Sequence, residues 1–340
     1  MQFEELHRLY HLPLFELLQQ SRKVHEAHWP ENEVQLCTLL SIKTGGCSED
    51  CSYCAQSARY STPVERENLM ACDDVMERAR AARANGSTRF CMGAAWKGVR
   101  DGTKKFDEVL DIVRNVSELG MEVCVTLGEV GPVEAQKLRD AGVTAYNHNI
   151  DTSPEHYENI VTTHTFEDRL NTIRNVQDVG MSVCAGGILG LGETIDDRLK
   201  MLEVLATLDP QPESVPINNL VPIPGTPMGD NEPVDTFAIV RMIAVTRIAI
   251  PGAKVRLSAG RAQLSEEAQT LCFFAGANSI FYGDKLLTTK NPQAQADLAL
   301  LQKLGMKPQM PFTDVSQPAC QSSGCAAEEK TAESESLVEA

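Results

Sequence analysis

Five segments of the sequence repeat one pattern, in which a helical stretch ends at a glycine and a short apolar strand follows. Two examples are VSELGMEVCVTLG at 116–128 and VQDVGMSVCAGGI at 176–188. Glycine accepts the positive φ that ends a helix, and apolar β-branched or aromatic residues suit the buried strand that comes next. The pattern therefore predicts βα units with parallel strands.

Three further stretches complete a set of eight strands: QLCTLLSIK at 35–43, ESVPINNLV at 213–221 and AKVRLSAG at 253–260. Helices are expected between them near 73–85, 104–119, 132–141, 165–179, 194–208, 233–249, 263–275 and 293–304. Eight alternating units favour an α/β fold of the (β/α)8 TIM-type barrel class over an open doubly wound sheet.

The two ends of the chain do not fit the repeat. We expect residues 1–30 to form a helical cap at the bottom of the barrel, 31–312 the barrel, and 313–340 a disordered acidic tail. Cys320 and Cys325 in that tail are expected to be exposed thiols without a structural role.

The net charge and the first residues of the chain bear on its partners and its cellular location. The chain has a formal net charge of -16, which argues against a nucleic-acid partner because such partners bind clustered Lys and Arg. MQFEELHRLYHLPLF carries acidic residues where a signal peptide needs a basic patch, and no stretch has the length of a membrane span. We therefore expect a cytoplasmic protein with reduced thiols, in which clustered cysteines indicate metal binding or catalysis.

Three cysteines, Cys47, Cys51 and Cys54, follow the first predicted strand, at the end of the barrel where chemistry takes place. A structural zinc site needs four ligands, and residues 46–57 offer no second pair. A 4Fe–4S cluster held by three thiolates keeps one iron open for a substrate or cofactor. Zinc stays an alternative, because short cysteine clusters often bind it. Tyr53 offers an aromatic face to such a site or packs within the loop.

Cys91, Cys124 and Cys184 each follow a helix-ending glycine by four or five residues, and Arg256 has a similar place on the seventh strand. Because side chains alternate along a strand, equal offsets predict that they point into the barrel together. A single strand cysteine is usually core filling. Three at matching offsets favour a site, whereas Cys37, Cys72 and Cys272 are interpreted as structural.

The spacing Cys47-x-x-x-Cys51-x-x-Cys54, with an aromatic before the last cysteine, resembles the radical S-adenosylmethionine (SAM) superfamily. There the open iron chelates SAM, and one electron releases a 5'-deoxyadenosyl radical. Together with TLLSIKTGGCSEDCSYCAQSARY, five more motifs resemble the biotin synthase family over about residues 30–310: STRFCMGAAW, YNHNIDTSPE, ESVPINNLVPIPGTP, VRLSAGR and NSIFYGDKLLTT.

That resemblance implies a role for each matching residue. The implied ligands are Cys47, Cys51 and Cys54 for a 4Fe–4S cluster, and Cys91, Cys124, Cys184 and Arg256 for a 2Fe–2S cluster; the implied SAM and substrate contacts are Tyr53, Asn147, Asn149, Asp151, Arg169 and Asn218. From the residues alone, Arg256 is a buried charge beside the metal, because a guanidinium has no free lone pair. The Asn and Asp residues after the fourth strand are alternatively turn formers.

The implied activity is that of a sulfurtransferase, which inserts sulfur at C9 and C6 of dethiobiotin with the 2Fe–2S cluster as sulfur donor. The family also implies a reduced flavodoxin or ferredoxin as electron donor, and a homodimer. Two alternatives stay open. One is another radical SAM barrel of the hydrogenase-maturation or pyrrolysine-pathway type, and the other is a non-enzymatic zinc or iron–sulfur module.

Overall fold

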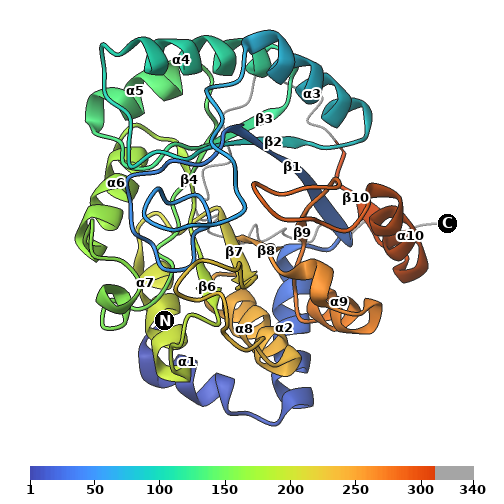
Figure 1. Ribbon diagram of the computed structural model, residues 1–340. Coiled ribbons are helices and arrows are strands. Elements are labelled where there is room, and N and C mark those ends of the chain that lie inside the picture. Colours follow the sequence, from blue (N-terminus) through green and yellow to red (C-terminus); the bar gives the residue numbers. More distant parts are fainter. Residues whose placement is uncertain (311–340) are drawn as a thin grey trace, which may run out of the picture.

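The computed structural model describes residues 1–310 and has a closed barrel of parallel strands at its centre (Figure 1). The predicted tail at 313–340, with Cys320 and Cys325, lies outside the described residues. The strands are β1 (Glu33–Lys43), β2 (Arg89–Ala94), β3 (Glu122–Thr126), β4 (Ala145–Asn147), β5 (Ser182–Cys184), β6 (Gly187–Leu189), β7 (Ser214–Asn219), β8 (Lys254–Leu257), β9 (Ser279–Phe281) and β10 (Lys307–Pro308).

The strands pair in the order β1-β2-β3-β4-β5-β7-β8-β9, and the ladder between β1 and β9 closes the ring. All of these ladders are parallel, and the short β10 pairs with the start of β1. The predicted (β/α)8 barrel is confirmed. The structure adds one detail: the fifth strand is broken into β5 and β6, and β6 pairs with β7 alone.

A close backbone contact explains this break. A Cβ atom added to Gly186, which lies between β5 and β6, would stand 2.0 Å from the carbonyl oxygen of Pro216. Only glycine permits the chain to pass so near to β7. The break lets the backbone N–H of Gly186 donate to the side-chain oxygen of Asn149, at 3.1 Å, instead of to a strand.

Helices surround the barrel (Figure 1). They are α1 (Phe3–Tyr10), α2 (Leu14–His28), α3 (Cys72–Ala84), α4 (Lys104–Ser117), α5 (Pro132–Asp140), α6 (Phe166–Asp178), α7 (Ile195–Thr207), α8 (Thr236–Ala249), α9 (Glu266–Phe274) and α10 (Ala294–Leu304). Capping boxes of Thr165 with Asp168 and of Thr194 with Asp197 fix where α6 and α7 begin. The core between helices and strands is apolar, with Val123 and Val125 of β3 completely buried.

The two N-terminal helices pack outside the ring, α1 against α7 and α8, and α2 against α8. Ser21 of α2 donates to the carbonyl of Ala275 at 2.7 Å, and the Trp29 indole N–H donates to the carbonyl of Pro251 at 3.1 Å. Both carbonyls belong to turns that lead into barrel strands. The division at residue 30 stays a prediction.

A buried ionic network connects three strands, β2, β3 and β8, at the amino-terminal end of the barrel. The guanidinium of Arg89, which is 2% exposed, contacts Glu122 on β3 at 2.6 Å and Glu213 beside β7 at 2.9 Å. Lys254 of β8 also pairs with Glu213. Burial alone would raise the pKa of Glu213, but Arg89 and Lys254 outweigh it and hold that pKa at about 2.

We predict that Arg89→Ala destabilises the fold strongly, because two partly buried carboxylates lose their main cation. Removing one partner of a buried ion pair costs about 3–5 kcal/mol. The matched control is Arg114→Ala on α4. The side chains of Arg114 and its partner Asp111 are each more than half exposed, so this variant should change the free energy of unfolding by less than about 1 kcal/mol. Thermal unfolding of both variants measures this, and equal midpoints would contradict the prediction.

Candidate functional site

The loops at the carboxyl ends of the strands surround a cavity of about 360 Å³. It is the place where a barrel of this class carries its chemistry. The predicted site residues that line it are Cys47, Cys51, Tyr53, Cys54, Cys91, Cys124, Asn147, Asn149, Asp151, Arg169, Asn218 and Arg256. Cys184 is completely buried and touches Asn147 and Arg256 of this lining. The structure thus brings all thirteen predicted residues together.

The outer thiols belong to the loop after β1. A β-bridge between Cys47 and Ser57 closes the loop, and the backbone N–H of Cys54 donates to the carbonyl of Cys51 at 2.9 Å. Burial raises the pKa of all three thiols, to about 11 at Cys54. They therefore hold their protons at neutral pH and must release them on binding a metal.

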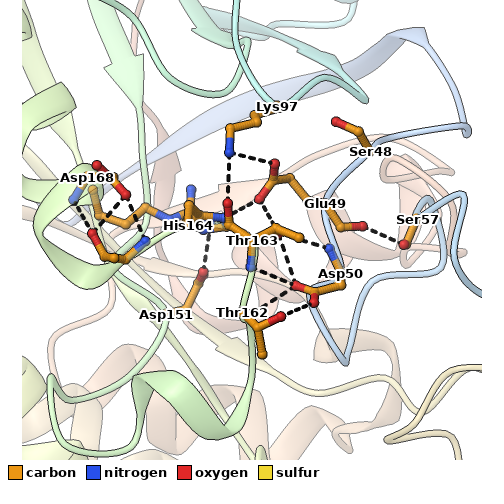
Figure 2. A network of polar contacts seen from close by, with 12 residues as sticks. Ser48, Glu49, Asp50, Ser57, Lys97, Asp151, Thr162, Thr163, His164 and Asp168 are labelled. Atoms are coloured by element: carbon orange, nitrogen blue, oxygen red, sulfur yellow. Dashed lines mark hydrogen bonds and ion pairs between the residues drawn. The ribbon is translucent and has the colours of Figure 1, made fainter.

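Two acidic residues between these cysteines tie the loop to the segment that precedes α6 (Figure 2). Asp50 accepts hydrogen bonds from the backbone N–H groups of Thr162 and Thr163, and Glu49 accepts from the Thr163 hydroxyl at 2.5 Å and contacts His164 Nδ1. Lys97 adds an ion pair to Glu49 at 3.4 Å and a hydrogen bond to the Thr163 carbonyl.

These contacts set the charge of both carboxylates. Burial alone would raise the pKa of both carboxylates. Hydrogen bonds from Thr163 and His164 lower the pKa of Glu49 instead. Hydrogen bonds from Thr162 and Thr163 lower the pKa of Asp50 to about 2. The two side chains are therefore anions that accept donors from the facing segment. Sequence reasoning missed this network, because the two acidic residues and their partners at 162–164 lie more than 110 residues apart and neither half has a distinctive motif.

Asp151 joins the outer loop to α6. Its Oδ2 accepts from the Tyr53 hydroxyl at 3.0 Å and from Arg169 Nη2 at 3.1 Å, and Arg169 Nε also donates to the Tyr157 hydroxyl at 2.8 Å. Asp151 has φ +65°, a left-handed conformation that few residues other than glycine adopt. The ion pair with Arg169 and the hydrogen bond from Tyr53 hold this carboxylate at the lining of the cavity.

The inner thiols project from neighbouring strands. Cys91 on β2 and Cys124 on β3 are direct register partners, and both pack in one buried cluster with Cys37 and Ala145. Cys184 comes from β5, and its sulfur lies 3.4 Å from Nη1 of Arg256. The hydrogen bonds with Cys184 and Cys91 lower the pKa of Cys124, whereas hydrogen bonds to Cys124 raise the pKa of Cys91 and Cys184.

Cys37, interpreted as structural from the sequence, lies in this same group of thiols. It is completely buried, and its sulfur is 3.4 Å from Nη2 of Arg256. The offset from a helix-ending glycine could not reveal it, because no such glycine precedes β1. The alternation of side chains along β1 was the signal that could have revealed Cys37, because it places Cys37 and Leu39 on the same face of the strand.

The asparagines near the inner thiols are held by neighbouring strands. The side-chain NH2 of Asn147 donates to the carbonyl of Cys184 at 3.2 Å, and its oxygen accepts from Thr126. Asn218 donates to the carbonyl of Gly187 and accepts from the backbone N–H of Ala259. Asn149 accepts from Gly186. These contacts fix the orientation of each amide, and all three residues line the cavity.

Within residues 1–310, no three His, Cys, Asp or Glu side chains converge as the ligands of a single metal ion do. The thiols instead form two separate groups on one cavity. In the same residues no helix has the length and apolar character needed to cross a membrane.

Two protein-family models match the chain: "Radical SAM superfamily" over residues 41–205 and "Biotin and Thiamin Synthesis associated domain" over residues 216–307. Among curated proteins, the chain is 57% identical to a biotin synthase of Myxococcus xanthus over 90% of this chain and 88% of that protein. It is also 57% identical to a biotin synthase of Gloeobacter violaceus, over 89% of this chain and 95% of that protein.

Solved structures share the fold. Methylornithine synthase superposes with a TM-score of 0.76 at 21% identity, covering 91% of this chain and 94% of that one. An FeFe-hydrogenase maturase from Carboxydothermus hydrogenoformans superposes with a TM-score of 0.77 at 18% identity, covering 92% of this chain and 77% of that one. At these identities the likeness concerns the fold alone, so it does not favour the activities of these two enzymes here.

We predict that Glu49→Gln loosens the cysteine loop, because an amide accepts more weakly than a carboxylate from Thr163 and His164 and loses the ion pair with Lys97. Hydrogen exchange of the backbone amides at 47–54 should become faster. The matched control is Glu158→Gln, at an exposed side chain, which should leave exchange in this loop unchanged. Equal exchange in both variants would show that Glu49 does not hold the loop.

Proposed function

Because this chain belongs to the biotin synthase family, we propose that it inserts sulfur between C9 and C6 of dethiobiotin to form biotin, using SAM and two iron–sulfur clusters. The observation that carries the proposal is the pair of thiol groups on one cavity, one at its mouth and one inside the barrel. Polar side chains that suit a small ligand lie between them.

The outer thiols suit a 4Fe–4S cluster with an open iron. Cys47, Cys51 and Cys54 supply three soft donors from one short loop, and the cavity beside them leaves room for SAM. We assign the SAM carboxylate to Arg169 and the adenine to the face of Tyr53. Asp151 holds both of these side chains by hydrogen bonds, so it orients them relative to the loop.

The inner thiols suit a 2Fe–2S cluster. Cys91, Cys124 and Cys184 are donors on rigid strands, and Arg256 adds a buried positive charge beside them. Clusters of this kind carry negative charge, which a nearby guanidinium stabilises. We propose that Arg256 either ligates this cluster or balances its charge.

When bound, the outer cluster supplies the electron that cleaves SAM, and the inner cluster supplies the sulfur. The side chains of the protein contribute by holding the ligands in position. Asn147, Asn149 and Asn218 are proposed to hold the ureido ring and ribose, and the barrel wall keeps water from the reacting carbons. C–H bonds of this kind are not acidic, so the site needs no general base.

Three further assignments rest on the family. We propose a reduced flavodoxin or ferredoxin as the electron donor, a homodimer as the assembly, and the cytoplasm as the location. Size-exclusion chromatography with light scattering tests the second of these directly.

We predict that Cys51→Ala abolishes reductive cleavage of SAM, because the outer cluster loses one of its three thiolates. Anaerobically purified protein, reconstituted with iron and sulfide and reduced, is assayed for 5'-deoxyadenosine. The control is Cys72→Ala, at a thiol outside the cavity lining, which should keep the reaction. Normal 5'-deoxyadenosine formation by Cys51→Ala would overturn the assignment.

We predict that Asn149→Ala weakens binding of SAM or dethiobiotin and leaves both clusters assembled, because this amide is proposed to contact ligands and not iron. A hydrogen bond to a neutral group contributes about 1 kcal/mol, which corresponds to roughly fivefold in the dissociation constant. Equilibrium binding of each ligand to the reconstituted protein measures this. Unchanged affinity for both would return Asn149 to a purely structural role.

A further inference from the structure

A fourth thiol lies in the inner site besides the three assigned to its cluster. Cys37 is completely buried on β1 and packs with Cys91 and Cys124 in one small cluster. Its sulfur donates to Gln35 Oε1 at 3.3 Å and lies 3.7 Å from the Ser279 hydroxyl. This environment is polar, in contrast to that of Cys272, an equally buried thiol that packs in the apolar core. Cys37 therefore does more than fill the core.

Arg256 places Cys37 relative to the predicted ligands. The two terminal nitrogens of its guanidinium are each 3.4 Å from a sulfur, Nη1 from Cys184 and Nη2 from Cys37. Cys37 therefore contacts the same buried guanidinium as Cys184, which is one of the predicted ligands. Thiolate is a far better iron ligand than a guanidinium, which has no free lone pair.

The charge of the site agrees with this arrangement. Arg256 is 1% exposed, and within residues 1–310 no carboxylate lies within ion-pair distance of it. A buried cation without an anionic partner is costly. Thiolates on both sides of the guanidinium, or the cluster that they hold, would supply the missing negative charge.

We propose that Cys37 is a fourth thiol donor of the inner site, which shares with Arg256 the coordination position left by Cys91, Cys124 and Cys184. The inference rests on the proposed function, because it presupposes the inner cluster. The ligand set can then be closed by thiolates alone, and Cys37 loses its proton when it binds. While Cys37 occupies that position, Arg256 stays protonated and donates hydrogen bonds to the sulfurs.

Three variants test the proposal: Arg256→Ala, Cys37→Ala and the double variant. The full chain is purified without oxygen and reconstituted with iron and sulfide, and the two clusters are quantified separately by Mössbauer spectroscopy. Each single variant should keep the 2Fe–2S signal, because the other side chain still faces the open position. The double variant should lose it. The 4Fe–4S signal of the same sample shows that the double variant is folded, and Cys272→Ala controls for loss of a buried thiol.

Two results would overturn the proposal. If the double variant keeps as much 2Fe–2S signal as Arg256→Ala, Cys37 is not a donor. If Arg256→Ala alone loses the signal, thiolates cannot close the site. Both results leave the proposed function intact as long as the unaltered protein carries both clusters and forms biotin. An unaltered protein without any 2Fe–2S signal would overturn the proposed function and this inference together.

Discussion

The pairing of β1 with β9 is the contact on which the rest of the site depends, because it closes the ring of strands. Closure makes every inward side chain face one shared interior. The side-chain period of a strand is two, so a shift of one residue in any ladder would turn its thiols toward the helices. The direct pairing of Cys91 with Cys124 therefore exists only while register is kept around the whole barrel.

Buried arginines give this interior its electrostatic character. Arg89 has Glu122 and Glu213 as partners, so its charge is balanced within the protein. Arg256 has sulfur atoms, a hydroxyl and an amide oxygen around it instead. Because the charge of Arg256 has no anionic partner among the described residues, unlike that of Arg89, the interior favours an anion beside Arg256. This imbalance favours a negatively charged group at the inner thiols and not at the amino-terminal end of the barrel, where Arg89 lies.

Much of the fold was predictable because its signals are local. Glycines before short apolar strands predicted the eight units, and matching offsets predicted that Cys91, Cys124 and Cys184 come together. The break between β5 and β6 was not predictable, since it follows from the approach of Gly186 to a residue on another strand. The same holds for the contact between Glu49 and His164, which lie 115 residues apart. Pairings of this kind depend on the closed barrel and have no local pattern.

The two thiol groups differ in what fixes them. The inner thiols lie on strands that are held by continuous ladders. The outer thiols lie on a loop that is held by one β-bridge and by side-chain contacts to Thr162 and Thr163. Loops of this kind open at lower free energy than barrel strands do.

The segment 147–151 connects these two groups. Asn147 at one end contacts Cys184 of the inner group, and Asp151 at the other end holds Tyr53 of the outer loop. A ligand bound to this segment is therefore placed relative to both groups at once. Because Asn147 lies at a strand end and the outer thiols lie on a loop, we expect the outer group to adjust when ligands bind and leave.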